Sequence, residues 1–178
     1  MVGCGCRGLD LARGLVAEGH AVRAVTRTAA RRAELEAAGC ECWIGDPDRI
    51  GTLRYALDNV TLVLWLLATA SGDPARVAAL HGSRLRMMLE KVTDTTVRGV
   101  VYEAAGTLDP DVLATGAQEL ERARRTNEIP YALLDADPAD RGAWRVAARA
   151  AIGALLGERR DAVMLVSPES RQDFPKPS

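Results

Sequence analysis

The chain has 178 residues, of which 48% are apolar, and a formal net charge of −1. This length and apolar content fit one domain with a single buried core, and the near balance of 23 basic and 24 acidic residues argues against nucleic acid as a partner. The longest apolar run, residues 60–70, is too short to cross a bilayer, and the first residues lack a signal-peptide pattern. We therefore expect a cytoplasmic protein with no membrane contact.

Three glycines open the chain, spaced as Gly3-x-Gly5-x-x-Gly8 and followed by a helical pattern over residues 9–18. After a strand, such glycines permit a sharp turn, a close approach of backbone to a pyrophosphate, and tight packing of helix on strand. The first N–H groups of the helix would then point at the phosphates. Only Met1 and Val2 precede Gly3, whereas strands usually have about five residues. Either this first strand is a stub, or the recorded start lies inside it.

Four Asp-Pro pairs punctuate the rest of the chain, at residues 46–47, 73–74, 109–110 and 137–138. Aspartate caps the free N–H groups of a first helical turn and proline is preset for the first helical position, so each pair predicts a helix start. A further alanine-rich helix is predicted over residues 28–38. Between the helices, short apolar or β-branched runs predict strands at residues 21–26, 40–44, 61–68, 97–102 and 131–135.

This alternation predicts an α/β fold, with a doubly wound parallel sheet inside three αβα layers. About six parallel strands are expected in the order 3-2-1-4-5-6, with a ligand crevice above strands one and four. Residues 1–158 would form this domain, and residues 159–178 an extra strand at 161–166 and a surface tail.

The four cysteines are paired as Cys4-x-Cys6 and Cys40-x-Cys42. In the predicted sheet the first pair ends strand one and Cys40 begins strand three, at opposite edges. We expect reduced thiols and no metal site, because buried cysteine usually behaves as a small apolar residue.

Arginines follow the second strand, where a fold that prefers NAD usually has an acid for the ribose hydroxyls. The sequence there is Thr26-Arg27-Thr28, with Arg31 and Arg32 one turn later. Guanidinium is suited to bidentate phosphate contacts, so the pattern predicts NADP as cofactor, with NAD as the alternative. Arg31 and Arg32 could equally belong to a solvated helix face, and we favour that interpretation for Arg32.

Two more loops follow strands at the same predicted edge. Asp46, after the third strand, is placed to approach an adenine edge or to cap a helix. The small residues from Ala68 and Thr69 to Gly72 would let a cofactor ribose pass close to the backbone, or simply form a permissive connection.

Together, Gly3-Cys-Gly-Cys-Arg-Gly8, Val25-Thr-Arg27 and Gly45-Asp46 resemble the cofactor half of the atypical, or extended, short-chain dehydrogenase/reductase superfamily. This Rossmann-fold group includes NAD(P)H-binding sensor proteins and sugar-nucleotide epimerases, and the resemblance covers about residues 1–105. The resemblance implies that Arg27 contacts the 2′-phosphate and that Asp46 contacts the adenine. It also implies that the glycines and Arg7 hold the pyrophosphate. The implied cofactor-binding turn consists of Gly3, Gly5, Cys6, Arg7 and Gly8.

The sequence departs from catalytic members of that superfamily. These members carry a Tyr-x-x-x-Lys pair on the helix after strand five, where lysine lowers the pKa of the tyrosine for proton transfer. The helix predicted at residues 111–125 has neither residue. The remaining catalytic candidates are Tyr102, as a proton donor, and Glu103, which would adjust the tyrosine pKa, although a tyrosine that ends a strand more often packs in the core.

Three functions stay open at this point. The preferred one is a cofactor-binding or redox-sensing module whose protein partner reads the state of the cofactor. The second is an NADPH-dependent reductase or epimerase-like enzyme that uses Tyr102 or an unassigned residue. The third is a vestigial cofactor site. Apolar helices at the edge of the sheet are compatible with a homodimer.

Overall fold

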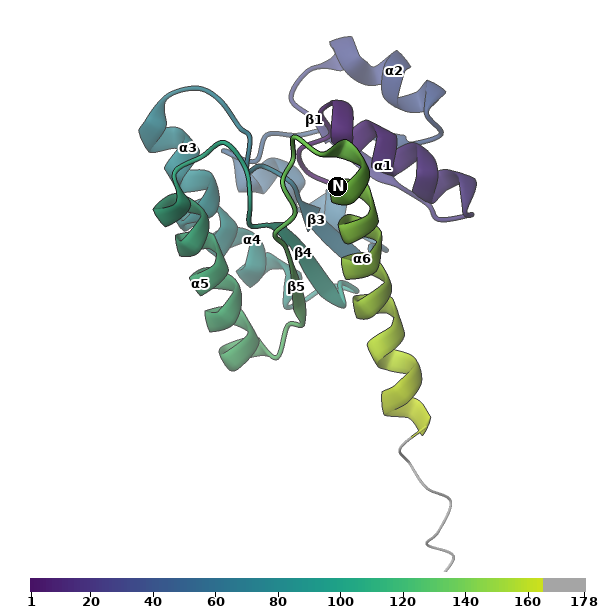
Figure 1. The fold of residues 1–178 in the computed structure, drawn as a ribbon, viewed down its shortest axis with the longest axis vertical. Helices are drawn as coiled ribbons and strands as arrows, with labels where there is room; N and C mark the ends of the chain where they lie inside the picture. The colour runs from purple at the N-terminus through teal and green to yellow at the C-terminus, as the bar shows by residue number, and fades with distance from the viewer. Residues whose placement is uncertain (165–178) are drawn as a thin grey trace, which may run out of the picture.

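The structure, a computed structural model, describes the backbone of residues 1–164 and the side chains of residues 1–157. Its strands are all parallel and form two sheets (Figure 1). The smaller sheet pairs β1 (Arg23–Thr26) with β2 (Glu41–Ile44). The larger one has the order β3-β4-β5, with β3 (Leu62–Trp65), β4 (Gly99–Glu103) and β5 (Tyr131–Leu134).

Met1 and Val2 connect the two sheets. The amine of Met1 donates to the carbonyl of Arg23 (2.7 Å), and the Val25 N–H donates to the carbonyl of Met1 (2.9 Å). Val2 pairs in parallel with Trp65, its N–H and carbonyl bonding to the neighbouring residues of that strand at 2.8 and 2.9 Å. The hydrogen-bonded order is therefore β2-β1-(Met1–Val2)-β3-β4-β5. The prediction of a single sheet of six strands is wrong, because the stretch before the glycine turn has only enough residues for one bridge.

Helices cover both sides of the strands. One side carries α1 (Cys6–Ala17) and α6 (Arg141–Met164), which contact each other, and α2 (Arg32–Ala37) packs against β2. The other side carries α3 (Pro74–His81), α4 (Ser83–Val92) and α5 (Pro110–Asn127), which pack together (Figure 1).

Two apolar clusters correspond to these two sides. Residues from α1 and α6, including Leu11 and Ile152, form the first cluster, and residues from α4 and α5, including Leu89 and Leu120, form the second. All five residues of β4 are buried, as expected for a central strand that is covered on both faces.

Two of the four Asp-Pro pairs start helices as predicted. The carboxylate of Asp73 accepts a hydrogen bond from the N–H of Arg76 at the start of α3, and the carboxylate of Asp109 accepts one from Asp111 at the start of α5 (2.9 Å each). The aspartate caps the helix and the proline takes its first position, as both residue types favour.

The other two Asp-Pro pairs form turns, so the helix starts predicted there are wrong. Asp46 accepts from the N–H of Asp48 (3.1 Å), and only short 3₁₀ segments follow, at Ile50–Leu53 and Tyr55–Leu57. Asp137 accepts from Ala139, and α6 starts later, at Arg141, where the carboxylate of Asp140 accepts from the N–H of Ala143. A second aspartate near the helix start therefore takes the capping role.

The carboxyl-terminal prediction is tested over only part of its length. Residues 161–164 continue α6, where an extra strand was expected. The rest of that range and the predicted tail lie outside the described residues. Within residues 1–164, no helix is both long and apolar enough to cross a membrane.

Candidate functional site

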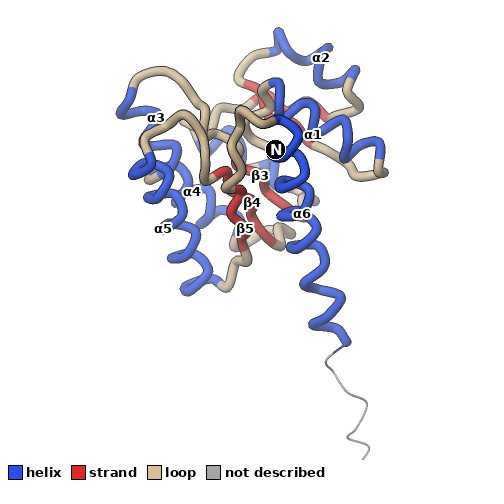
Figure 2. Tube along the Cα trace, in the orientation of Figure 1, coloured by secondary structure: helices blue, strands red, loops and turns tan. Residues whose placement is uncertain are grey.

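A cleft of about 920 Å³ lies at the carboxyl ends of the strands, where the connecting loops gather at one edge (Figure 2). Its walls come from the glycine turn, from the loops after β1, β2 and β3, and from the segment between β5 and α6. Most of the predicted site residues line it: Gly3, Gly5, Cys6, Arg7, Gly8, Thr26, Arg27, Asp46, Thr69 and Glu103.

The glycine turn is built as its spacing predicts. Gly3 has φ +90°, and a Cβ there would lie 1.9 Å from the carbonyl oxygen of Leu66. A Cβ on Gly8 would lie 2.7 Å from the carbonyl oxygen of Gly3, so only glycine lets the helix approach the turn this closely. Gly5 differs, because a Cβ there would meet no atom within 4 Å. Gly5 is the residue before α1, and no side chain caps the helix start. The first N–H groups of α1 are thus accessible to a ligand in the cleft.

Beneath the turn, the fully buried carboxylate of Glu103 joins four segments of the chain. One of its oxygens accepts from the Arg7 guanidinium of α1 (3.1 Å) and from the Trp144 indole of α6 (2.8 Å). The other accepts from the N–H of Ala68, after β3 (3.0 Å). Arg7 also donates to the hydroxyl of Thr69 (3.1 Å) and lies over the ring of Trp144. A buried carboxylate keeps its charge only with such partners.

Two arginines line the cleft together with the glycine turn. Arg31 donates to the carbonyl of Cys4 (2.5 Å) and to the carboxylate of Glu34 (2.8 Å), and its side chain lines the cleft. Arg27 also lines the cleft and is exposed. Arg32 instead pairs with Glu36 on the surface of α2 (3.2 Å), which agrees with the solvated helix face expected for it.

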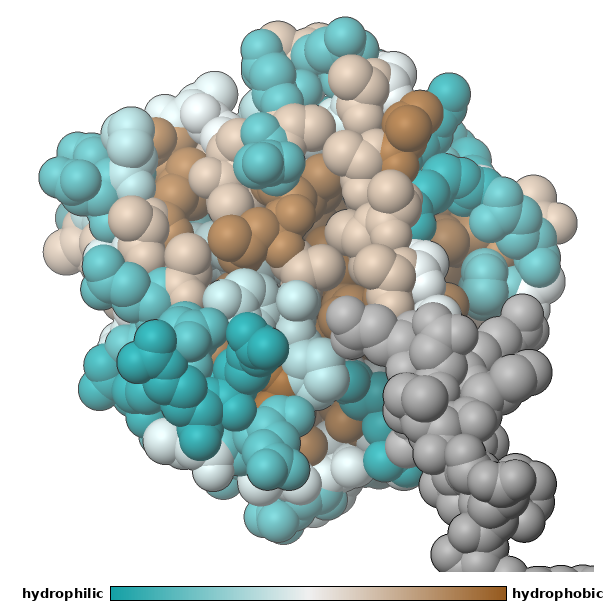
Figure 3. All heavy atoms as spheres, turned by 60° about the horizontal axis from the view of Figure 1, so that its bottom comes forward, coloured by the Kyte–Doolittle hydropathy of each residue, from teal (hydrophilic) through white to brown (hydrophobic). Residues whose placement is uncertain are grey.

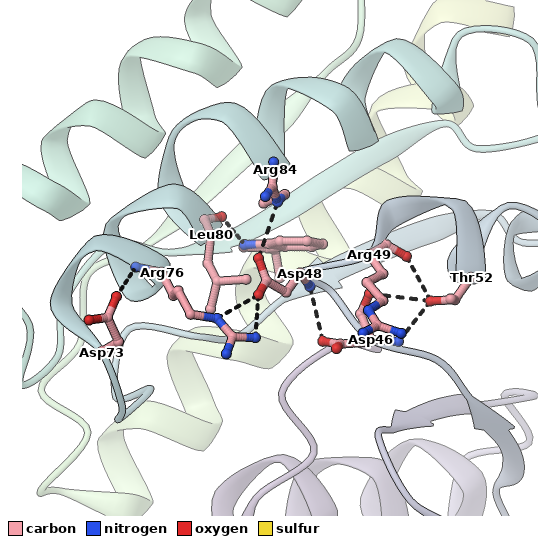
Figure 4. Close-up of polar contacts among 9 residues, drawn as sticks. Asp46, Asp48, Arg49, Thr52, Asp73, Arg76, Leu80 and Arg84 are labelled. Atoms are coloured by element: carbon pink, nitrogen blue, oxygen red, sulfur yellow. Dashed lines mark hydrogen bonds and ion pairs between the residues drawn. The ribbon is translucent and has the colours of Figure 1, made fainter.

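Ion pairs between side chains connect the loop after β2, on one side of the cleft, to α3 and α4 (Figure 4). The carboxylate of Asp48 accepts two hydrogen bonds from Arg76 (2.8 and 2.5 Å) and one from Arg84 (3.2 Å). These bonds, Arg76 first, hold the pKa of Asp48 below its usual value. Asp46, Asp48 and Arg76 all line the cleft. The loop after β2, which was expected to lie at the adenine, is therefore held to α3 by the ion pair between Asp48 and Arg76.

The two catalytic candidates point in opposite directions, because successive side chains of a strand face opposite sides. Tyr102 is fully buried on the side of α3 and α5 and does not line the cleft. Its hydroxyl donates to the carbonyl of Leu113 (3.1 Å) and lies 2.6 Å from Nδ1 of His81. Burial raises the pKa of Tyr102 and lowers that of His81. Of the two candidates, only Glu103 lines the cleft.

Sequence reasoning missed three residues that line the cleft. Trp144 was predicted only as part of a helix, and Asp48 and Arg76 were given no role. Ala68 contributes its backbone N–H to Glu103 but is fully buried and does not line the cleft.

The cysteines are all free. Cys4 lines the cleft at the carboxyl ends of the strands, Cys40 directly precedes the start of β2, and both belong to one buried apolar cluster. Burial raises the pKa of Cys4 to about 11, which keeps it a neutral thiol. Among the described residues, no three histidine, cysteine or acidic side chains gather where they could hold a metal ion.

Comparison with known proteins gives likeness in structure only. No protein-family model and no curated protein matches the chain. Triphenylmethane reductase of Citrobacter sp., solved with NADP(H), aligns with a TM-score of 0.56 and 24% identity over 75% of this chain and 47% of the reductase. A UDP-glucose 4-epimerase of Thermotoga maritima aligns at 0.62 and 16% over 75% of this chain and 53% of the epimerase. A short-chain dehydrogenase/reductase superfamily protein of Agrobacterium tumefaciens, solved with bound NAD, aligns at 0.62 and 18% over 96% of this chain and 62% of that protein.

The chain shares the parallel α/β, Rossmann-like fold of these three proteins. The resemblance noted in the sequence is confirmed at this level. The chain spans about half the length of the first of these solved structures, and its sheets of two and three strands make it a partial Rossmann-like domain.

Proposed function

We propose that this protein binds a nicotinamide dinucleotide in the cleft and prefers NADP(H) to NAD(H). The open start of α1 carries the proposal: the glycine turn lines the cleft, and no side chain caps the first N–H groups of that helix. Such a helix end is suited to a diphosphate. The solved structures named above, with bound NAD or NADP(H), support the same class of cofactor.

Arg27 and Arg31 support the preference for NADP(H). Both side chains line the cleft beside the turn, where the 2′-phosphate of NADP(H) would lie. Two guanidinium groups would stabilise that phosphate and have no matching group on the ribose of NAD(H).

We infer a binding or redox-sensing role in place of turnover. α5 has neither tyrosine nor lysine, so the Tyr-x-x-x-Lys pair is missing there. The hydroxyl of Tyr102, the alternative proton donor, is buried on the far side of β4. The protein should therefore bind NADPH without oxidising it in the presence of carbonyl or quinone compounds. Steady NADPH oxidation with such a compound, abolished by Tyr102→Phe, would instead support a reductase or epimerase-like enzyme.

The cofactor preference can be measured by calorimetric titration with NADPH and NADH. We expect NADPH to bind at least about tenfold more tightly, and Arg27→Ala to remove most of this difference while leaving NADH affinity unchanged. Arg32→Ala is the matched control, because Arg32 pairs with Glu36 on the surface and does not line the cleft. Equal or reversed affinities would contradict the preference for NADP(H).

The diphosphate cradle has its own test at Gly5. A side chain at this position projects into open space, so Gly5→Leu should fill the cradle and abolish cofactor binding without lowering the melting temperature. Gly51→Leu is the control, because a Cβ on Gly51 also meets no atom within 4 Å and Gly51 does not line the cleft. If the unchanged protein showed no thermal shift with about 1 mM of either cofactor, the site would be vestigial and the proposal wrong.

A further inference from the structure

Two segments on different sides of the cofactor cleft are joined by the side chains of Asp48 and Arg76. Asp48 follows β2, and Arg76 lies in the first turn of α3, which follows β3. In the hydrogen-bonded order, β1 and Met1–Val2 lie between β2 and β3, so at about 4.8 Å per strand β2 and β3 are about 14 Å apart. The ion pair therefore connects the two sides of the cleft at its Asp46 end.

This end of the cleft has a charged rim and a deeper apolar wall. Asp46, Asp48 and Arg76 line it, whereas the opposite edge of the molecule, in Figure 3, exposes apolar surface among polar residues. Val77 and Leu80 of α3 also line the cleft, and both are less exposed than Arg76. A ligand that reaches the apolar side chains of α3 therefore passes the ion pair at the rim.

Arg76 is the movable part of this connection. Asp48 also accepts a hydrogen bond from Arg84 of α4 (3.2 Å), so it keeps a partner when Arg76 leaves, and Figure 4 shows the two arginines on different sides of the carboxylate. The backbone at Arg76 is held by its N–H, which donates to the carboxylate of Asp73 (2.9 Å).

The exposures of the two side chains agree with this division. The side chain of Asp48 is only 17% exposed, whereas that of Arg76 is 68% exposed. An exposed arginine breaks an ion pair at little cost, because water replaces the carboxylate as the acceptor. The guanidinium can therefore rotate into solvent while both walls of the cleft keep their packing.

We propose that the side chain of Arg76 is a gate at the adenine end of the cleft, closed when it bonds to Asp48 and open when it rotates into solvent. This inference rests on the proposed binding of a nicotinamide dinucleotide. The cofactor passes the gate on entry and on release, so the association and dissociation rates are both multiplied by the fraction of time that the gate is open. The dissociation constant, which is the ratio of the two rates, stays the same.

The test measures both rates by stopped-flow fluorescence, for NADPH and for NADH. Energy transfer from tryptophan, including Trp144 in the cleft, reports the bound cofactor, and an excess of the oxidised cofactor starts dissociation. The unchanged protein is compared with Arg76→Gln and Arg84→Gln. Arg84→Gln is the matched control, because Arg84 bonds to the same carboxylate but does not line the cleft.

We expect Arg76→Gln to raise both rates at least about threefold and to change the dissociation constant less than about twofold. Arg84→Gln should leave both rates within about twofold of those of the unchanged protein. Higher salt should speed release from the unchanged protein more than from Arg76→Gln, because screening weakens the ion pair that closes the gate.

Unchanged rates in Arg76→Gln would overturn the gate. Faster dissociation without faster association would also overturn it, because Arg76 would then be a contact that holds the bound cofactor. Equal acceleration by Arg84→Gln would make the whole loop after β2 the moving part, and the proposal would again be wrong. In these three cases the cofactor still binds, so the proposed function stands. If neither NADPH nor NADH bound to the unchanged protein, both the proposed function and the gate would be wrong.

Discussion

Replacing Glu103 by glutamine tests the buried junction beneath the glycine turn. The substitution keeps the size of the side chain but removes its charge and turns one acceptor oxygen into a donor. Arg7, about one-fifth exposed, then keeps its charge without a counter-charge. One of the donors that now point at the carboxylate also loses its acceptor, whether Trp144 or the N–H of Ala68.

The expected cost follows from these contacts. Removing one partner of a buried ion pair usually destabilises a protein by about 3–5 kcal/mol. The partial exposure of Arg7 to water moves the value to the lower end, so we expect Glu103→Gln to reduce the free energy of unfolding by about 3 kcal/mol. For a chain of this length, that loss corresponds to a fall in melting temperature of about 6–12 °C.

Urea unfolding followed by circular dichroism at pH 7 measures this loss. The control is Glu36→Gln, which removes the exposed pair with Arg32 and should cost less than about 0.5 kcal/mol. A double-mutant cycle with Arg7→Met should give a coupling energy of at least about 1 kcal/mol between positions 7 and 103. If Glu103→Gln were as mild as Glu36→Gln, or if the coupling were absent, the reasoning on this junction would be refuted.

Three other predictions concern stability. Asp109→Ala should cost about 1 kcal/mol in urea unfolding because it removes the cap of α5, while Asp137→Ala should cost clearly less because Asp137 starts only a turn; equal losses would contradict the capping assignment. Gly116→Ala should cost at least about 1–3 kcal/mol by the same assay, because the new Cβ would lie 2.0 Å from the Tyr102 hydroxyl; an unchanged stability would mean that Tyr102 is not held there. The Met1 amine has a pKa near 8.0 when unfolded and about 6 when folded, so the unfolded chain binds more protons between these values and stability falls as pH drops from 8 to 6. The fall should reach about 3 kcal/mol and level off below about pH 5, and an amino-acetylated chain should lack it; identical pH profiles for the two chains would refute the assignment.

Local patterns in the sequence were sufficient to predict the glycine turn and most of the helices and strands. Gly3 and Gly8 are required by contacts within the turn and its neighbouring strand, and the cap at Asp109 depends on adjacent residues, so both could be predicted. The position of Arg27 followed from the end of β1.

The interior of the site could not be predicted in the same way. Arg7 and Glu103 are 96 positions apart, and nothing near either residue indicates the other. Side chains alternate between the two faces of β4, so Tyr102 and Glu103 must point in opposite directions. The sequence does not say which of the two faces lies toward the cleft. Asp137 failed as a helix cap because Asp140, three positions later, competes for the same role.

The four-way junction at Glu103 also has a consequence for sequence variation. Its carboxylate is shared by α1, the loop after β3, and α6, so an exchange at position 103 leaves both Arg7 and Trp144 without this acceptor. Homologues that lose the acid should therefore carry an uncharged residue at position 7 and a side chain without a donor at position 144, and these three alignment columns should change together.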